Sequence, residues 1–265
     1  MAETIAVLSL KGGTGKTTTV RTLADVLRRI DLDVLAVDLD PQGNLSDYFD
    51  VARDATPTVA DVLNGDAKAK AAVHDGIIPA TPILAEVERS LSGKMGRELV
   101  LKKALKKERE QHDVVLIDCP PALGLLTING LVAADWALVS SEAQYFALQG
   151  VEGALEVIEQ AKEFYNPDLQ WLGVLLNIAD MRTVHSREAY TSLKEHFDDK
   201  VFETVIRSSI AYAESAERAK SILDHRPDLG ADYLLLADEV LGRIGLSQPR
   251  RKLKPLLNGA RPVVD

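Results

Sequence analysis

The residues best suited to chemistry form a glycine-rich run at positions 11–18, KGGTGKTT. Glycines in such a run let backbone N–H groups turn inward around phosphate oxygens, and a helix that begins there adds partial positive charge. Lys16 would then meet the β- and γ-phosphates of a nucleoside triphosphate, and the Thr17 hydroxyl would coordinate Mg²⁺. The general pattern GxxxxGK[ST] is not strictly satisfied, because Leu10 stands at its first glycine position. The sequence therefore predicts a phosphate loop that departs from the usual form and carries an extra lysine, Lys11.

Three carboxylates follow apolar runs that are typical of buried strands. Asp118 comes after VVLI, where a carboxylate must lie to hold Mg²⁺ through water opposite the threonine. Asp38 lies near the end of the run DVLAVDL at 33–39 and Asp40 follows it, and two carboxylates two residues apart on a strand project to the same face. One of them would orient or deprotonate the attacking water in hydrolysis. For Asp38 a second interpretation is equally open, in which it caps a loop or accepts hydrogen bonds.

These residues need strands and helices to position them, and the sequence alternates the two from end to end. A strand is predicted at 4–10, before the glycine run, and apolar residues recur at helical spacing after it. Further strands are predicted at 33–39, 113–117, 136–140, 171–177 and 201–206, and helices at 147–165, 186–197 and 231–244. Residues 50–110 are less regular and predict one or two helices. The fold expected is α/β, a doubly wound and mostly parallel sheet with helices on both faces, as in P-loop NTPases.

Composition limits the class of protein. The chain has 265 residues, of which 46% are hydrophobic and 27% charged, so disordered and fibrous classes are excluded. The net charge of −9 requires that any nucleic-acid surface be a local patch. The single cysteine, Cys119, excludes an intrachain disulfide and fits a reducing cytosol. We predict one ATPase domain at residues 1–246 and a basic, proline-containing tail at 247–265.

Longer segments around the carboxylates carry a resemblance to a known family. Residues 38–44 read DLDPQGN, and residues 118–129 read DCPPALGLLTIN. Together with the glycine run they resemble the deviant Walker-type ATPases of the ParA/MinD family, and more specifically the short, Soj-like ParA proteins of chromosome and plasmid partition. Residues 144–150 (QYFALQG) and 175–183 (LLNIADMRT) also align. The resemblance covers most of the chain from its first predicted strand to its last predicted helix.

The resemblance implies a role for each matching position. Lys11 would cross a sandwich dimer to reach the partner's nucleotide and neutralise charge on the triphosphate. Gly12 would lie against the dimer interface. Asp40 would position the hydrolytic water, and both Asp40 and Asp118 would reach Mg²⁺ through water. The catalytic residues would thus be Lys11, Lys16 and Asp40, the metal residues Thr17, Asp118 and Asp40, and the nucleotide-binding residues Lys11, Gly12, Gly13, Thr14, Gly15, Lys16, Thr17 and Thr18.

The resemblance also implies a function. ATP and Mg²⁺ would be the cofactors, and ATP would promote a homodimer that binds double-stranded DNA without sequence preference. A ParB-like partner would stimulate slow hydrolysis of ATP to ADP and phosphate and thereby release the DNA. Such a protein would be cytoplasmic, associated with the nucleoid when ATP is bound, and without stable membrane association.

One segment departs from the family pattern. Where the family has a PRNxRLxEAP-like stretch whose arginines contribute to DNA binding, residues 207–216 read RSSIAYAESA. The arginine positions fall on Ser208 and Ala211, so the DNA contact must be built differently or be weaker. The candidates are Arg182, Arg187, Arg207 and Arg218. Each of these arginines is equally well interpreted as a solvated surface charge.

Two other functions fit the same loop. A MinD-like positioning ATPase would need an amphipathic C-terminal helix, and Leu253, Leu256 and Leu257 among basic residues resemble one faintly, although Pro255 interrupts it. A metabolic ligase that activates a small substrate with ATP, forming an amide or a ring, would show turnover that depends on its substrate and not on DNA.

Overall fold

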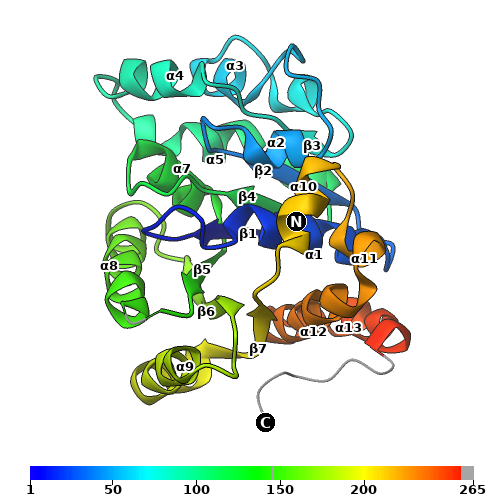
Figure 1. Ribbon diagram of the computed structural model, residues 1–265. Coiled ribbons are helices and arrows are strands. Elements are labelled where there is room, and N and C mark those ends of the chain that lie inside the picture. Colours follow the sequence, from blue (N-terminus) through cyan, green and yellow to red (C-terminus); the bar gives the residue numbers. More distant parts are fainter. Residues whose placement is uncertain (145, 258–265) are drawn as a thin grey trace.

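A seven-stranded sheet forms the centre of the molecule (Figure 1). The computed structural model describes residues 1–144 and 146–257. The strands are β1 (Glu3–Leu8), β2 (Val34–Asp38), β3 (Ile77–Ile78), β4 (Val114–Asp118), β5 (Trp136–Glu142), β6 (Gln170–Ala179) and β7 (Val201–Arg207). They lie in the order β3-β2-β4-β1-β5-β6-β7, and every neighbouring pair is parallel. The fold is therefore α/β with an all-parallel sheet.

The strand order reverses direction beside β1. β1 pairs with β4 on one side and with β5 on the other, so the chain winds outward from it both ways. Open α/β sheets bind ligands at such a point, in the crevice beyond the carboxyl ends of the strands. The glycine run follows β1 directly, and Asp118 ends the neighbouring strand β4. The topology thus brings together residues that are far apart in the sequence.

Two layers of helices cover the sheet, as predicted (Figure 1). Packed into one hydrophobic core are side chains of α3 (Val59–Asn64), α4 (Leu84–Leu91), α5 (Val100–Leu105), α7 (Leu125–Ala133), α8 (Ala147–Phe164) and α9 (Val184–Phe197). The other core holds side chains of α1 (Lys16–Arg28), α2 (Asn44–Tyr48), α10 (Ala211–Glu217), α11 (Ile222–His225), α12 (Pro227–Arg243) and α13 (Ser247–Leu253). A short helix, α6 (Glu108–Gln111), precedes β4. The six strands expected from the sequence are all present, with ends moved by one or two residues.

The region 50–110 holds more structure than the one or two helices predicted. It contains α3, α4, α5, most of α6, two 3₁₀ turns and the two-residue strand β3. α4 has eight residues, and the other helices of this region are shorter. A helix of about two turns shows too few apolar repeats for its period to be recognised.

The described part of the predicted tail packs against the domain. α13 is followed by a 3₁₀ turn at Lys254–Leu257, and Leu253 is fully buried in the core beside α12. Pro249 is tolerated because it lies in the first helical turn, where the backbone N–H needs no helical partner. Residues 258–265 of the tail lie outside the described residues. The boundary at residue 246 remains a prediction.

Candidate functional site

The phosphate loop connects β1 to α1 through two glycines with left-handed backbone. Gly13 has a φ of 77° and Gly15 a φ of 82°, values that residues with a Cβ rarely adopt. A Cβ on Gly15 would also lie 3.1 Å from the side chain of Asn177. α1 begins at Lys16, so the unpaired N–H groups of its first turn face the loop. This geometry produces a small anion-binding hollow at a helix N-terminus.

Ser9 holds the interior of the loop together. Its hydroxyl donates to the carbonyl of Lys11 at 2.7 Å and accepts from the Thr14 hydroxyl at 2.9 Å. It also accepts from the Lys16 ammonium at 3.0 Å, and that ammonium lies 3.4 Å from the Lys11 carbonyl. Lys16 is only 6% exposed. Its charge is therefore already held inside the hollow where phosphate would bind.

Two residues that sequence reasoning did not single out support the loop from the neighbouring strands. The Ser140 hydroxyl, on β5, donates to the carbonyl of Thr14 at 2.6 Å. The Asn177 amide, on β6, donates to the Ser140 hydroxyl at 2.8 Å. Both residues are buried. Their sequence signal is a polar residue near the carboxyl end of an apolar strand, the same signal that identified Asp118.

Thr17 and Asp118 meet at the mouth of the loop. The Thr17 hydroxyl donates to Asp118 Oδ2 at 2.7 Å, while Asp118 Oδ1 is buried and has no hydrogen-bond partner among the described residues. Burial, together with the nearby carboxylate of Asp38, raises the pKa of Asp118 well above its usual range. A buried carboxylate with an unused oxygen beside a threonine hydroxyl fits a hydrated Mg²⁺, which prefers oxygen ligands and would restore the ionised form. Thr17 and Asp118 would hold that ion.

Asp38 and Asp40 face different surroundings. Asp38 is fully buried, and its carboxylate accepts hydrogen bonds from the Asp40 backbone N–H (3.0 Å) and from the backbone N–H and hydroxyl of Ser46 (3.0 and 2.7 Å). Of the two interpretations left open for Asp38, these contacts match the hydrogen-bond acceptor. Asp40 lies beyond the end of β2 and is only partly buried. Among the described residues it accepts one hydrogen bond, from the Gln42 backbone N–H, so its carboxylate remains available to a ligand.

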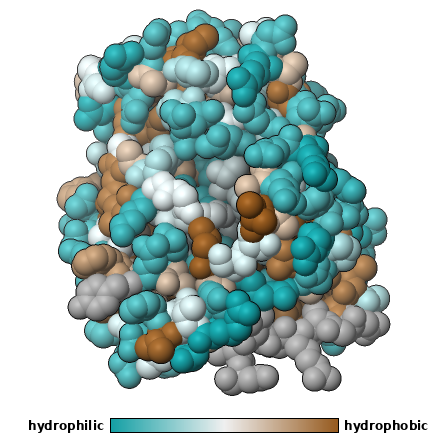
Figure 2. Space-filling model, in the orientation of Figure 1, coloured by the Kyte–Doolittle hydropathy of each residue, from teal (hydrophilic) through white to brown (hydrophobic). Residues whose placement is uncertain are grey.

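A cleft of about 740 Å³ opens in front of the loop. Its lining includes residues 12–18 of the loop together with Asp40, so the structure brings these predicted site residues together. The far side of the cleft is formed by the end of β7 and by α10, through residues such as Arg207 and Tyr212. Figure 2 shows that hydrophilic residues cover most of this face of the molecule, with hydrophobic residues between them in small groups. The cleft is large enough for a nucleoside triphosphate.

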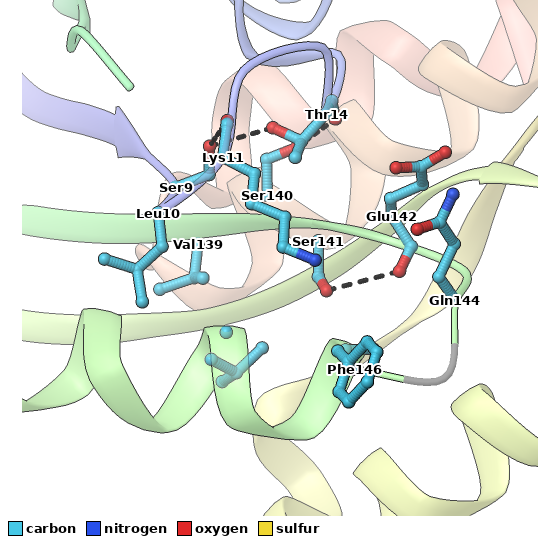
Figure 3. Close-up of a pocket in the computed structure, with 13 residues that line it drawn as sticks. Ser9, Leu10, Lys11, Thr14, Val139, Ser140, Ser141, Glu142, Gln144 and Phe146 are labelled. Carbon is cyan, nitrogen blue, oxygen red and sulfur yellow. Dashed lines mark hydrogen bonds between the residues drawn. The ribbon is translucent and has the colours of Figure 1, made fainter. Parts of the chain in front are cut away.

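Lys11 is the one predicted loop residue that leaves this cleft. Its side chain extends away from the loop towards the end of β5 and the start of α8 (Figure 3). The ammonium lies 5.6 Å from the centre of the Phe146 ring, within cation–π range. Lys11 lines a separate small cavity of about 30 Å³ with Ser141, Glu142 and Phe146. Within its own chain, Lys11 therefore presents no charge to the nucleotide cleft.

Comparison with known proteins decides the family. Residues 2–171 match the family described as AAA_31, an AAA domain. The chain is 39% identical over 249 residues to the sporulation initiation inhibitor protein Soj of Bacillus subtilis, covering 91% of this chain and 98% of that protein. It is 40% identical over 246 residues to the chromosome-partitioning ATPase Soj of Thermus thermophilus, covering 91% of this chain and 96% of that protein. The chain belongs to the ParA/MinD family of ATPases.

Solved structures of similar proteins agree with this assignment. A cobyrinic acid a,c-diamide synthase of Mycobacterium smegmatis, with bound ADP and magnesium, has a TM-score of 0.74 and 38% identity over 85% of this chain and 95% of that one. The septum site-determining protein MinD of Pyrococcus horikoshii, with Mg-ADP, has a TM-score of 0.74 and 27% identity over 93% of this chain and 98% of that one. The resemblance stated from the sequence motifs and the predicted P-loop fold are both confirmed.

The four arginines predicted to contact DNA differ in how strongly each is already paired within its own chain. Arg182 forms two hydrogen bonds of 2.8 Å to Asp180, and this pairing lowers the pKa of Asp180 to about 2. Arg187 donates to the backbone carbonyls of Met181 and Arg182. Their side chains are exposed, so both could still turn to a phosphate.

Arg207 and Arg218 differ more strongly from each other. Arg207 lines the nucleotide cleft and forms a 2.9 Å ion pair with Asp232, whose side chain is 2% exposed. Arg218 is exposed just after α10, and it forms no ion pair within residues 1–144 and 146–257. Arg207 is therefore the least suited of the four to a DNA surface, because turning to a phosphate would leave the buried Asp232 carboxylate unpaired. The DNA role of the other three remains a prediction.

Proposed function

We propose that this chain is a ParA-like ATPase for DNA segregation, whose ATP-bound sandwich dimer binds DNA non-specifically and is released when a ParB-like partner stimulates hydrolysis. The observation that carries the proposal is the separation of the two loop lysines. Lys16 is buried inside the loop, whereas Lys11 points out of it. A cation that does not serve its own nucleotide is suited to reach that of a second subunit.

The residues divide the work of hydrolysis. The loop amides and Lys16 hold the phosphates of ATP, and Thr17 with Asp118 holds Mg²⁺. The metal, when bound, neutralises charge that develops on the transferring phosphoryl group. Asp40, partly exposed beside the loop, orients the attacking water. Lys11 of the second subunit supplies further positive charge in trans, as an arginine finger does.

The proposed cycle can be tested by a DNA-binding titration with ATP, ADP and no nucleotide. Binding should require ATP and should fall steeply with salt, because phosphate contacts release counterions. Asp40→Ala should retain ATP and accumulate as a DNA-bound dimer. Equal DNA affinity with ADP, or no binding with ATP at low salt, would contradict the partition function. Loss of ATP binding by Asp40→Ala would show that its role is different.

A metabolic ligase is the second candidate, because one of the similar solved structures is named as a diamide synthase, an amide-forming enzyme. The chain's single cysteine, Cys119, is fully buried, and burial raises the pKa of its thiol, so it offers no thiolate to release ammonia from glutamine. A ligase of this type would therefore need ammonia that these residues do not themselves release from glutamine. ATP turnover that appears only with ammonia and a carboxylic acid substrate, and not with DNA, would favour it.

A MinD-like membrane function can be tested in the same titration with anionic liposomes. The buried Leu253 already turns the apolar side of α13 into the core. Within the part of the chain that the structure describes, no helix is long and apolar enough to cross a bilayer. ATP-dependent binding to liposomes in place of DNA would favour this alternative.

A further inference from the structure

The nucleotide cleft has two walls that face each other beyond the phosphate loop. One wall contains Asp40 and continues along α2 to Tyr48, and the other is formed by α10 and the segment that precedes it. Since the loop binds the phosphates at one end of the cleft, the ribose and base must extend towards the other end, where α10 lies. The two walls therefore contact different parts of one nucleotide.

A buried hydrogen bond joins the two walls. The Ser215 hydroxyl on α10 donates to the backbone carbonyl of Lys220 at 2.6 Å, so its oxygen is left to accept the hydroxyl proton of Tyr48. Tyr48 is 1% exposed and Ser215 is 0% exposed. A hydrogen bond shielded from water in this way is not exchanged easily for a solvent contact. Movement of α10 must therefore be transmitted to the end of α2.

The start of α2 is fixed as well, and Asp40 lies between the fixed points. The Asp38 carboxylate, at the end of β2, accepts from the backbone N–H groups of Asp40 and Ser46. The Ser46 hydroxyl in turn accepts from the Ala80 backbone N–H at 2.9 Å. The short segment that carries Asp40 is thus attached to the sheet at one end and, through α2 and Tyr48, to α10 at the other.

α10 also carries a tyrosine at the cleft whose hydroxyl has no hydrogen-bond partner among the described residues. Tyr212 lines the cleft, and its hydroxyl is buried but forms no hydrogen bond within the described residues. Tyr212 and Ser215 are three residues apart on the helix, which places them on the same side. A ribose or base that satisfies the Tyr212 hydroxyl would press on the same helical turn that holds Tyr48.

We propose that Tyr48 and Ser215 are positioning residues that couple occupancy of the base end of the cleft to the placement of Asp40. The inference rests on the proposed ATPase function, because it assigns Asp40 to the attacking water. Neither side chain needs to contact the phosphates. Their effect should appear in the rate of hydrolysis and not in the affinity for nucleotide.

Tyr48→Phe tests the coupling, because it removes the hydroxyl and keeps the ring over which Arg21 lies. Losing one buried hydrogen bond should lower kcat about three- to tenfold, while KM and ATP affinity change less than about twofold. Ser215→Ala should lower kcat at least as much, because it removes the bond to Tyr48 and also the bond to the Lys220 carbonyl. The double variant should be no slower than Ser215→Ala, because Tyr48→Phe removes a bond that Ser215→Ala has already removed. Tyr190→Phe is the matched control and should leave kcat unchanged, because Tyr190 lies on α9 outside the cleft and its hydroxyl donates to Glu203 on β7.

Hydrogen exchange supplies a readout that does not depend on turnover. ADP or ATP should slow the exchange of backbone amides in residues 44–48 of the wild type, and this effect should be absent in Tyr48→Phe. A wild-type kcat in Tyr48→Phe, a higher KM with unchanged kcat, or single effects that multiply in the double variant would overturn the inference. If the wild type hydrolyses no ATP, the proposed function fails, and exchange with ADP still decides whether the two walls are coupled.

Discussion

Lys16→Ala should weaken ATP binding by about 100-fold, and the structure supplies the terms of that estimate. Within the described residues the ammonium makes two hydrogen bonds, to Ser9 Oγ and the Lys11 carbonyl, worth about 2 kcal/mol together. On binding it would exchange them for charge-assisted bonds to two phosphates, worth about 5 kcal/mol together. The difference of about 3 kcal/mol corresponds to roughly two factors of ten in Kd.

Calorimetric titration of ATP into the monomer measures this effect, and Lys11→Ala is the matched control. Both variants remove one loop lysine, but the Lys11 ammonium lies over Phe146 outside the cleft. Lys11→Ala should therefore bind ATP within about twofold of the wild type, since no phosphate contact is lost within the chain. Its defect should appear in hydrolysis by the dimer. Equal losses of affinity in the two variants would refute the division of roles between the lysines.

Three further perturbations test separate parts of the site. Gly12→Val should still bind ATP, because among the described residues a Cβ at Gly12 meets nothing within 4 Å. It should remain monomeric by sedimentation, because the larger side chain would block close approach at the proposed dimer interface; a dimeric variant would contradict the sandwich model. Arg207→Ala should lower the free energy of unfolding in urea by about 2 kcal/mol at pH 7.5, because it leaves the buried Asp232 carboxylate unpaired. Burial raises the pKa of Asp232, so its protonated form is favoured in the folded state, and the loss of unfolding free energy in Arg207→Ala should be smaller at pH 5. A larger loss at pH 5 would contradict the raised pKa. Thr17→Val should raise the Mg²⁺ concentration for half-maximal ATPase activity about tenfold or more, because one ligand and the hydrogen bond that orients Asp118 are lost; an unchanged Mg²⁺ requirement would remove Thr17 from the metal site.

The phosphate loop could be predicted from the sequence because its geometry is local. Left-handed φ values at Gly13 and Gly15 follow from residue type, and Lys16 follows them at a fixed spacing. Asp118 could be predicted because a polar residue that ends a buried parallel strand must lie at the edge where ligands bind. In both cases the covalent chain itself carries the information.

Partners that are distant in the sequence could not be predicted. Nothing near Arg207 in the chain indicates that Asp232 would neutralise it, because that contact depends on how α12 packs beside β7. The hydrogen bond between Tyr48 and Ser215 joins residues 167 positions apart, and it could not be predicted from the sequence either. The residue pattern indicates which residues could do chemistry, whereas tertiary packing determines which of them remain available.

This distinction bears on how an acidic chain could bind DNA. The net charge is −9, and Arg182 and Arg207 each already face a carboxylate of their own chain. A phosphate must compete with those carboxylates, so a single subunit should bind DNA weakly. In an ATP-held dimer the same patch occurs twice on one rigid body, and the second patch then binds at a high effective concentration. Nucleotide state could thus switch DNA affinity by joining two weak patches, even if neither patch changes its structure.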